Sequence, residues 1–243
     1  MKESKGCIFD FDDTLVETTV YYDRAKERFA EKMKNFGFPV GEALGVLNQF
    51  DISNVLKCGG FRKDCFPNAL VQTYEHFCKI NQKAVSETTR SWMADLGWWV
   101  FKQPTELIAG ATEVLFRLGR EMPLILATKG DPEIQTLRLE ESGLKQYFKA
   151  VYIVPDKTDR EYAGIASENG LVPEMSWIIG NSMKGDINPG LKSGFNCIHV
   201  FHHNTWDFEE EEPVGEYLAV RSITEVPEIV LGAGNRWAAG GKQ

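Results

Sequence analysis

Three carboxylates lie together near the start of the chain, in the sequence FDFDDTL from Phe9 to Leu15. The apolar stretch before them predicts a buried strand that ends at Asp10 and Asp12. Like charges at this spacing repel one another and raise one another's pKa unless a cation neutralises them. A solvated turn would not explain the apolar side chains between the acids. The pattern therefore favours a divalent metal, bound where ligands of open α/β sheets bind, at the carboxyl ends of the strands.

Further polar groups follow three later apolar runs of the chain. The segment from Thr128 to Gly130 precedes a helix start and offers a hydroxyl and free backbone N–H groups suited to a phosphate. Lys157 comes after the next run and offers a cation, and Asp186 follows the fourth run with another carboxylate. Each feature alone also fits an ordinary turn or a solvated loop. Their order along the chain makes the combination specific.

Five short apolar runs are typical of buried parallel strands. Between the later runs lie helix-length segments such as Asp131 to Ser142, where Asp131 can cap the start, Pro132 suits the first turn and Gly143 suits the exit. This alternation predicts an α/β fold, a doubly wound Rossmann-like parallel sheet. The predicted strands are Gly6 to Phe11, Pro123 to Thr128, Val151 to Val154, Ser176 to Gly180 and Asn196 to Val200.

The stretch from residue 17 to residue 103 differs from the rest, because it contains helical patterns and no convincing strand. We predict an inserted all-helical cap domain at 17–103, with residues 1–16 and 104–243 forming the α/β catalytic core. Apolar residues recur at intervals of three or four and predict core packing. We expect Trp92, Trp98 and Trp99 to pack against neighbouring helices as well.

The four sets of polar residues, in this order, resemble the motifs of the haloacid dehalogenase superfamily. Asp10 and Asp12 match its D-x-D motif, Thr128 its second motif, Lys157 its lysine motif and Asp186 its distal acidic metal ligand. The resemblance spans most of the chain, and the helical insertion is similar to the family's type 1 cap.

Shorter runs are similar to a phosphatase-like branch of that superfamily: TKGD from Thr128, SGL from Ser142, GNS from Gly180 and DINP from Asp186. Many relatives have an acidic residue where this chain has Asn181. An amide carries no charge but can still accept a hydrogen bond from a metal-bound water. We therefore expect a supporting role for Asn181, with an altered affinity for magnesium or an altered orientation of the groups around it.

The resemblance implies a Mg²⁺-dependent phosphatase that hydrolyses small phosphorylated metabolites through an aspartyl-phosphate. Asp10 is the expected nucleophile and Asp12 the general acid and base. Thr128 and Lys157 are the expected partners of the phosphoryl group. The metal would be held by Asp10, by the main-chain carbonyl of Asp12 and by Asp186.

Substrate binding is predicted at two places. Thr128, Lys129 and Gly130 would hold the phosphoryl group. Phe61 and Arg62 belong to a glycine-hinged segment of the insertion, Cys58 to Lys63, where Phe61 could cover the leaving group and Arg62 could contact a second anionic group. A solvated turn between two helices is an equally good interpretation for any one of these two residues.

Three other functions stay open at this point. A phosphomutase of sugar phosphates would use the same phosphoaspartate and return the phosphoryl group to the sugar. A dehalogenase needs no acid to protonate a leaving oxygen, so Asp12 argues against it. A non-catalytic phosphoacceptor module would place its aspartate after the third strand, where this chain has Pro155, Asp156 and Lys157.

Composition limits the partners of the protein. The net charge of −8 and the pI near 5.2 argue against nucleic acid. No run approaches the roughly 18 apolar residues of a membrane span, so no membrane partner is predicted. Five unpaired cysteines without a targeting peptide favour a cytoplasmic, reduced protein, in which Cys58 and Cys65 are packed or idle thiols. The oligomeric state is not predicted.

Three segments of the last quarter receive no function. We expect Glu209 to Glu212 to be a solvated acidic loop and the tail after Gly232 to be frayed. His199, His202 and His203 point in mixed directions along an extended chain, so we assign them no catalytic role.

Overall fold

The protein is described here by a computed structural model of residues 4–232, so the predicted frayed tail lies outside the described residues. Six strands form one parallel sheet in the order β3-β2-β1-β4-β5-β6, which confirms the predicted fold class. The strands are β1 Cys7–Phe9, β2 Leu124–Lys129, β3 Ala150–Val154, β4 Trp177–Gly180, β5 Asn196–Val200 and β6 Leu218–Val220.

The sequence prediction missed β6 because this strand has only three residues and lies at the edge of the sheet. The prediction also made β1 too long. Pairing with β2 and β4 covers Cys7 to Phe9, and the chain then leaves the sheet at Asp10, whose N–H still donates to the carbonyl of Ile179 at 2.9 Å.

Helices cover both faces of the sheet, which explains why the strands are continuous apolar runs. Along β1, Cys7 and Phe9 belong to the core on one face and Ile8 to the core on the other. The first face packs against α5 (Ala111–Gly119), α6 (Pro132–Glu141) and α9 (Val226–Gly232), and the second against α7 (Asp159–Asn169) and α8 (Asn188–Lys192).

Helix α6 begins and ends as the sequence predicts. The Asp131 side chain accepts a hydrogen bond from the N–H of Glu133 at 3.2 Å, and Pro132 occupies the first turn. Gly143, after the helix, has a φ of +67°, which favours glycine. The start of α6 is thereby fixed directly after the end of β2.

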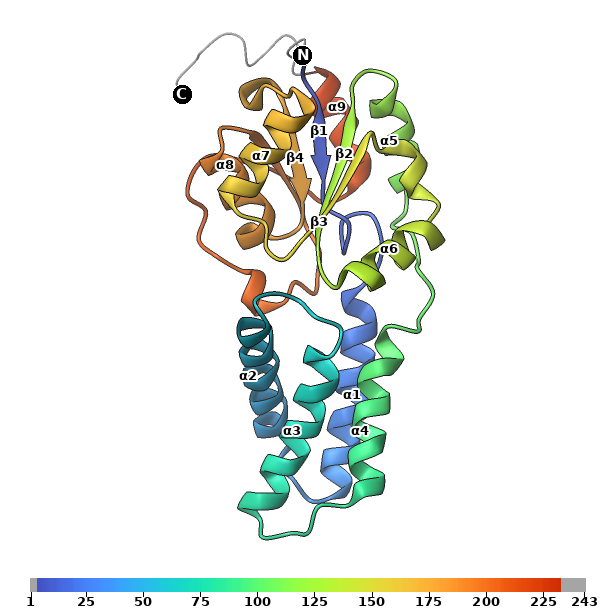
Figure 1. The fold of residues 1–243 in the computed structure, drawn as a ribbon, viewed down its shortest axis with the longest axis vertical. Helices are drawn as coiled ribbons and strands as arrows, with labels where there is room; N and C mark the ends of the chain where they lie inside the picture. Colours follow the sequence, from blue (N-terminus) through green and yellow to red (C-terminus); the bar gives the residue numbers. More distant parts are fainter. Residues whose placement is uncertain (1–3, 233–243) are drawn as a thin grey trace.

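Four antiparallel helices form a bundle below the carboxyl edge of the sheet (Figure 1). They are α1 Thr19–Asn35, α2 Val40–Cys58, α3 Cys65–Ile80 and α4 Glu87–Val100. The bundle has a hydrophobic core of its own, built on side chains such as Phe29, Leu70, Phe77 and Met93. No helix within residues 4–232 is long and apolar enough to cross a lipid bilayer.

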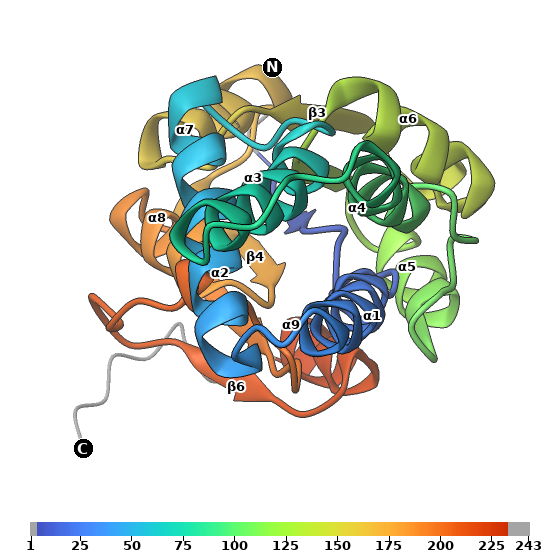
Figure 2. The same cartoon turned by 90° about the horizontal axis from the view of Figure 1, so that it is seen from below.

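The chain enters and leaves the bundle through two adjacent segments. The N–H of Glu17 donates to the carbonyl of Glu106 at 2.9 Å, and the N–H of Ile108 donates to that of Leu15 at 2.9 Å. The two connecting segments therefore lie side by side, and the domain boundaries at residues 17 and 103 stay a prediction. Viewed from below, the four helices lie over the ends of the central strands (Figure 2).

Candidate active site

Three predicted residues meet at the carboxyl edge of the sheet. Asp10 follows β1, Lys157 lies in the loop after β3, and Asp186 lies in a π-helical turn, Met183–Ile187, after β4. The ammonium of Lys157 donates to Asp10 Oδ1 at 2.6 Å and also to Asp186 Oδ1. The three side chains are at most 7% exposed, so this is a buried charge cluster.

Burial sets the electrostatics of this cluster. It raises the pKa of Asp10 to about 7, while the Lys157 ammonium acts to lower it and the Asp186 carboxylate to raise it. Burial acts to lower the pKa of Lys157, but the two carboxylates outweigh it and raise that pKa. One cation therefore faces two carboxylates. A further positive charge beside Asp10 would stabilise its ionised form.

Asp186 is held under the sheet edge by close packing against Gly180. A Cβ atom at Gly180 would lie 2.3 Å from the Asp186 carboxylate, so only glycine allows this approach. The N–H of Ser182 donates to Asp186 Oδ2 at 3.0 Å, and the hydroxyl of Tyr162 donates to Oδ1 at 3.1 Å. With Lys157, these donors engage both oxygens of the carboxylate.

The donor set beside Asp10 fits a magnesium ion. The terminal amide of Asn181 lies 3.1 Å from Asp10 Oδ2 and 3.2 Å from the main-chain carbonyl oxygen of Asp12. Adjacent ligands of an octahedral magnesium lie about 2.9–3.0 Å apart, given bonds of about 2.1 Å. The Asn181 amide can donate to both oxygens from its NH₂ group, or it can turn its carbonyl oxygen to join them around a cation.

This geometry bears on two predicted roles. Asp186 Oδ1 accepts hydrogen bonds from Lys157 and Tyr162 and Oδ2 accepts one from Ser182, whereas the Asn181 amide faces the two other expected ligands. Direct coordination by Asp186 stays a prediction. The supporting role of Asn181 stays a prediction too, and its amide lies within hydrogen-bond distance of both expected ligand oxygens.

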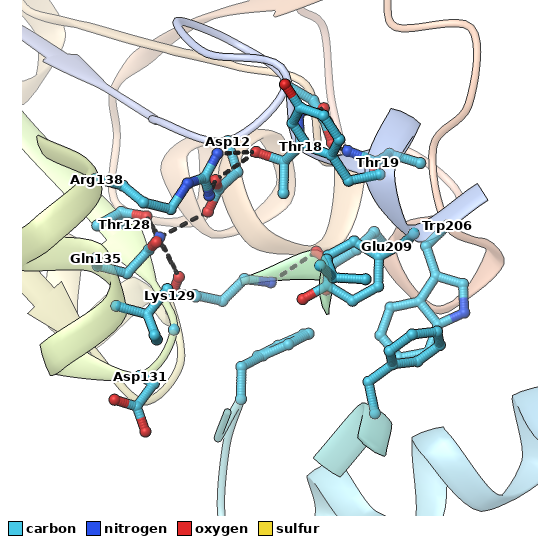
Figure 3. A pocket seen from close by; sticks show the side chains of 18 of the residues that line it. Asp12, Thr18, Thr19, Thr128, Lys129, Asp131, Gln135, Arg138, Trp206 and Glu209 are labelled. Carbon is cyan, nitrogen blue, oxygen red and sulfur yellow. Dashed lines mark hydrogen bonds and ion pairs between the residues drawn. The ribbon is translucent and has the colours of Figure 1, made fainter. Parts of the chain in front are cut away.

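Asp12 is the centre of a second network, which joins the sheet to the entrance of the bundle (Figure 3). Asp12 Oδ2 accepts a hydrogen bond from Gln135 Nε2 at 2.6 Å. Asp12 Oδ1 accepts one from the Thr18 hydroxyl at 2.6 Å and forms an ion pair with Arg138. Arg138 also donates to the Thr18 hydroxyl at 2.7 Å. Both oxygens of the carboxylate are thus held in place.

The second motif is connected to the same network. Gln135 Nε2 donates to the Thr128 hydroxyl at 2.7 Å and to the main-chain carbonyl of Lys129 at 2.9 Å. Gly130 allows this contact, because a Cβ atom there would lie 2.8 Å from Gln135 Cγ and its φ of +146° disfavours other residues. The predicted phosphoryl-binding segment is therefore positioned by α6.

The prediction of a solvated acidic loop is wrong for Glu209. Its side chain is 13% exposed, accepts a hydrogen bond from Lys129 Nζ at 2.6 Å and accepts another from the Ser182 hydroxyl at 2.5 Å. Burial alone would raise the pKa of Glu209, but Lys129 and Ser182 hold it below its ordinary value. Lys129, predicted to bind substrate, is thus an ion-pair partner that also lines the cavity. Residues 210–212 are exposed, as predicted.

Phe61 and Arg62 line the same cavity from the bundle side. The Phe61 ring lies 6.1 Å from the Trp206 ring and 4.9 Å from Lys129 Nζ. Arg62 is more exposed, at 57%, and its Nε lies 3.8 Å from Asp131 Oδ2. The segment predicted to select the substrate therefore lies against the core.

A core segment after β5 reaches back to the bundle. Trp206 Nε1 donates to Asn48 Oδ1 on α2 at 2.7 Å, and Asn204 Nδ2 donates to Asp23 Oδ2 on α1 at 2.6 Å. Sheet, bundle and this segment enclose a cavity of about 220 Å³. One water needs only about 10–15 Å³ of such space, so a small organic molecule has room there.

Several of these residues were missed by the sequence analysis. Gln135 and Arg138 lie one turn apart on α6, directly after the second motif, so helical periodicity could have placed them near Asp12. Glu209 and Trp206 gave no such signal, because their partners come from other parts of the chain.

The cysteines and histidines to which the sequence analysis assigned no function can be located in the structure. Cys58 is exposed and Cys65 buried, and their sulfur atoms lie within 4.8 Å of each other and of the Asp64 carboxylate. The His199 ring contacts the main-chain carbonyl of Asn181 at 2.9 Å. The buried His202 ring lies 3.7 Å from Asp13. The absence of a catalytic role for these histidines stays a prediction.

Comparison with known proteins agrees with this geometry. The family model of haloacid dehalogenase-like hydrolases matches residues 4–171. The chain belongs to this family. Pyrimidine 5′-nucleotidase PynA from Streptococcus pneumoniae is 25% identical over 242 residues, which cover 91% of this chain and 94% of that protein. N-acylneuraminate-9-phosphatase from Homo sapiens is 21% identical over 235 residues, 93% of each chain.

A solved structure shares the fold over nearly the whole length of this haloacid dehalogenase-like hydrolase. It is a haloacid dehalogenase-like family hydrolase from Xanthomonas campestris, with a TM-score of 0.75 and 24% identity. The match covers 96% of this chain and 96% of that chain. The arrangement of sheet and inserted bundle is therefore that of a known fold.

Proposed function

We propose that the protein is a magnesium-dependent phosphatase of small phosphorylated metabolites that works through an aspartyl-phosphate on Asp10. The proposal rests on one observation. Lys157 joins Asp10 and Asp186 at the sheet edge, and the oxygens of Asp10, Asn181 and the Asp12 main chain can surround one cation there. Membership of a hydrolase family, and relatives named as a nucleotidase and a phosphatase, support it.

In the first half of the reaction, an Asp10 carboxylate oxygen attacks phosphorus and the bond from phosphorus to the leaving oxygen breaks. Lys157 fixes one oxygen of Asp10, and the Thr14 hydroxyl donates to the other at 2.9 Å, so the carboxylate is oriented before the substrate binds. Thr128 and the main-chain N–H groups after it would hold phosphoryl oxygens. A bound magnesium would lower the repulsion between the two anions.

Asp12 enters this half protonated and gives its proton to the leaving oxygen, which departs as a hydroxyl group and leaves Asp12 ionised. To reach that oxygen, it must exchange its bond with Gln135 for one with the substrate, while Arg138 and Thr18 keep hold of its other oxygen. In the second half, Asp12 takes a proton from water as the water attacks phosphorus. The bond between Asp10 and phosphorus breaks, and inorganic phosphate leaves.

Release of inorganic phosphate tests the proposal. The purified protein is assayed with p-nitrophenyl phosphate and a panel of sugar phosphates and nucleotides, with magnesium and after chelation by EDTA. We expect phosphate release that stops with EDTA and returns with added magnesium. Isomerisation of a sugar phosphate without phosphate release would instead indicate a phosphomutase. A phosphoaspartate that persists for many minutes would indicate a phosphoacceptor module.

A further inference from the structure

The bundle contributes a wall to the cavity that the phosphoryl chemistry does not use. Helix α1 presents Tyr22 and Lys26, and helix α2 presents Asp51 and Val55. Each pair is separated by four residues, so its two members lie on one face of their helix. The core residues grip only a phosphoryl group, so this wall must meet the remainder of the substrate.

Aromatic rings dominate this part of the cavity. The Tyr22 ring lies 5.0 Å from the Phe66 ring and 6.3 Å from the Phe101 ring, in both cases edge-on. Phe61 and Trp206 form a second edge-on pair, and all five side chains line the cavity. Aromatic walls of this kind favour a flat ring over a fully hydrated polyol, because they gain from stacking and from apolar burial.

Two polar groups on the same wall have no protein partner. Neither the Asp51 carboxylate nor the Tyr22 hydroxyl makes a hydrogen bond or ion pair with another group in residues 4–232, although both residues line the cavity and are partly buried. Burial raises the pKa of Asp51 to about 7, and the charge of Lys26 only partly opposes this. A buried carboxylate without a partner costs free energy that a hydrogen-bond donor on a ligand would offset.

The Tyr22 hydroxyl experiences the electric field of two carboxylates, one on the bundle and one on the core. Burial raises the pKa of this hydroxyl, and the charges of Asp51 and Asp12 raise it further. The hydroxyl therefore stays protonated and can donate. Asp51 and the expected general acid Asp12 line the same cavity as Tyr22.

We propose that Asp51 and Tyr22 form a leaving-group subsite for a planar ring that carries an N–H donor beside a hydrogen-bond acceptor, the pattern of a nucleobase. Asp51 accepts from the ring N–H, Tyr22 donates to the neighbouring carbonyl, and the aromatic side chains cover the ring faces. The preferred substrates are then nucleoside monophosphates. This inference rests on the phosphatase activity proposed above.

Two substrates with the same scissile bond isolate the ring. Ribose 5-phosphate and uridine 5′-monophosphate (UMP) differ only in the base. We expect wild-type kcat/KM to be at least about tenfold higher for UMP, the effect of one charge-assisted hydrogen bond. The Asp51→Asn substitution should reduce this ratio several-fold, because the amide oxygen still accepts a hydrogen bond but carries no charge. Tyr22→Phe, which removes one neutral hydrogen bond, should reduce it several-fold.

A modified base tests the contact directly. N3-methyluridine 5′-monophosphate lacks the N–H, so the wild-type protein should hydrolyse it about tenfold less efficiently than UMP. The Asp51→Asn protein, whose amide oxygen still accepts a hydrogen bond but carries no charge, should distinguish the two several-fold less than the wild type does. A purely structural role of Asp51 would lower both rates together. The matched control is Glu42→Gln, an exposed acid on the same helix, which should leave the UMP preference intact.

The possible failures are distinguishable. If no phosphate monoester is hydrolysed, including p-nitrophenyl phosphate, the proposed function itself is overturned. If phosphate monoesters are hydrolysed but UMP is not preferred, or if Asp51→Asn lowers both rates equally, only the subsite is overturned. Should Asp51→Asn fail to fold, the wild-type comparison of UMP with its N3-methyl derivative still decides.

Discussion

The two ends of the cavity differ in how their polar groups are satisfied. At the sheet end, Asp10 and Asp186 both bond to Lys157, and all three side chains are almost fully buried. At the bundle end, Asp51 and Tyr22 make no side-chain hydrogen bond within residues 4–232. The first arrangement is complete before a substrate arrives and suits one invariant group, the phosphoryl group. The second arrangement gains its hydrogen-bond partners only when a ligand binds. Substitutions there can therefore change which leaving group is preferred.

Removing the nucleophile should cause the largest loss. Asp10→Asn keeps the shape of the side chain but cannot attack phosphorus, so we expect kcat to fall by at least about a hundredfold. Phosphate release measures the loss, and circular dichroism should match the wild type. Asp95→Asn, the same change at an exposed position of α4, is the control. Activity above about a hundredth of wild type in a folded Asp10→Asn protein would remove Asp10 from this role.

Changing Asp12 should lower the rate by an amount that depends on the basicity of the leaving group. Asp12→Asn cannot protonate the leaving oxygen, so cleavage of a sugar phosphate should slow by about 10²-fold or more. An aryl leaving group needs little protonation, so release of p-nitrophenol in the first turnover should fall much less. Equal losses for the two substrates would show that Asp12 is not the acid.

Changing Asn181 tests the metal site without reference to turnover. Asn181→Asp adds a charged ligand beside Asp10 and Asp12, so we expect magnesium or manganese to bind about tenfold more tightly, or about 1.4 kcal/mol. Calorimetry or the paramagnetic signal of bound manganese would measure it. Asn35→Asp, an exposed change on α1, should leave the affinity unchanged. An affinity unaltered by Asn181→Asp would place the metal away from this side chain.

The smallest effect is expected at Arg62. Loss of one charge-assisted hydrogen bond that is shielded from solvent would raise KM for an anionic substrate roughly tenfold after Arg62→Ala. The side chain is 57% exposed and close to Asp131, so solvent screens it and the rise should be about fivefold or less. A small substrate such as p-nitrophenyl phosphate serves as the control. An equal rise for both substrates would make the segment structural.

The same contrast explains what the sequence could predict. The sheet and its motif residues follow from local rules, since each apolar run predicts a strand and each strand end predicts where Asp10, Thr128, Lys157 and Asp186 lie. Glu209 looked like one acid in an exposed run. Its burial depends on Lys129 and Ser182, 80 and 27 residues away, and no local pattern encodes those distances.

The bundle wall was harder to predict for a similar reason. Helical periodicity identified the apolar stripes of the bundle, but it could not show which polar residue on α2 faces the cavity. Asp51 became a candidate only when α1, α3 and the segment around Trp206 were seen to enclose it. Phe61 and Arg62 were found because glycines and cations interrupt the helical pattern there.

The central claim is that Asp10 carries the phosphoryl group during turnover. Wild-type and Asp12→Asn proteins are mixed with magnesium and p-nitrophenyl phosphate, quenched in acid within the first turnover, digested and analysed by mass spectrometry. We expect one phosphorylated peptide, containing Asp10, which accumulates in Asp12→Asn because hydrolysis of the phosphoaspartate has lost its base. Phosphate release with no phosphorylated peptide at any time, or with the phosphoryl group on another residue, would contradict it.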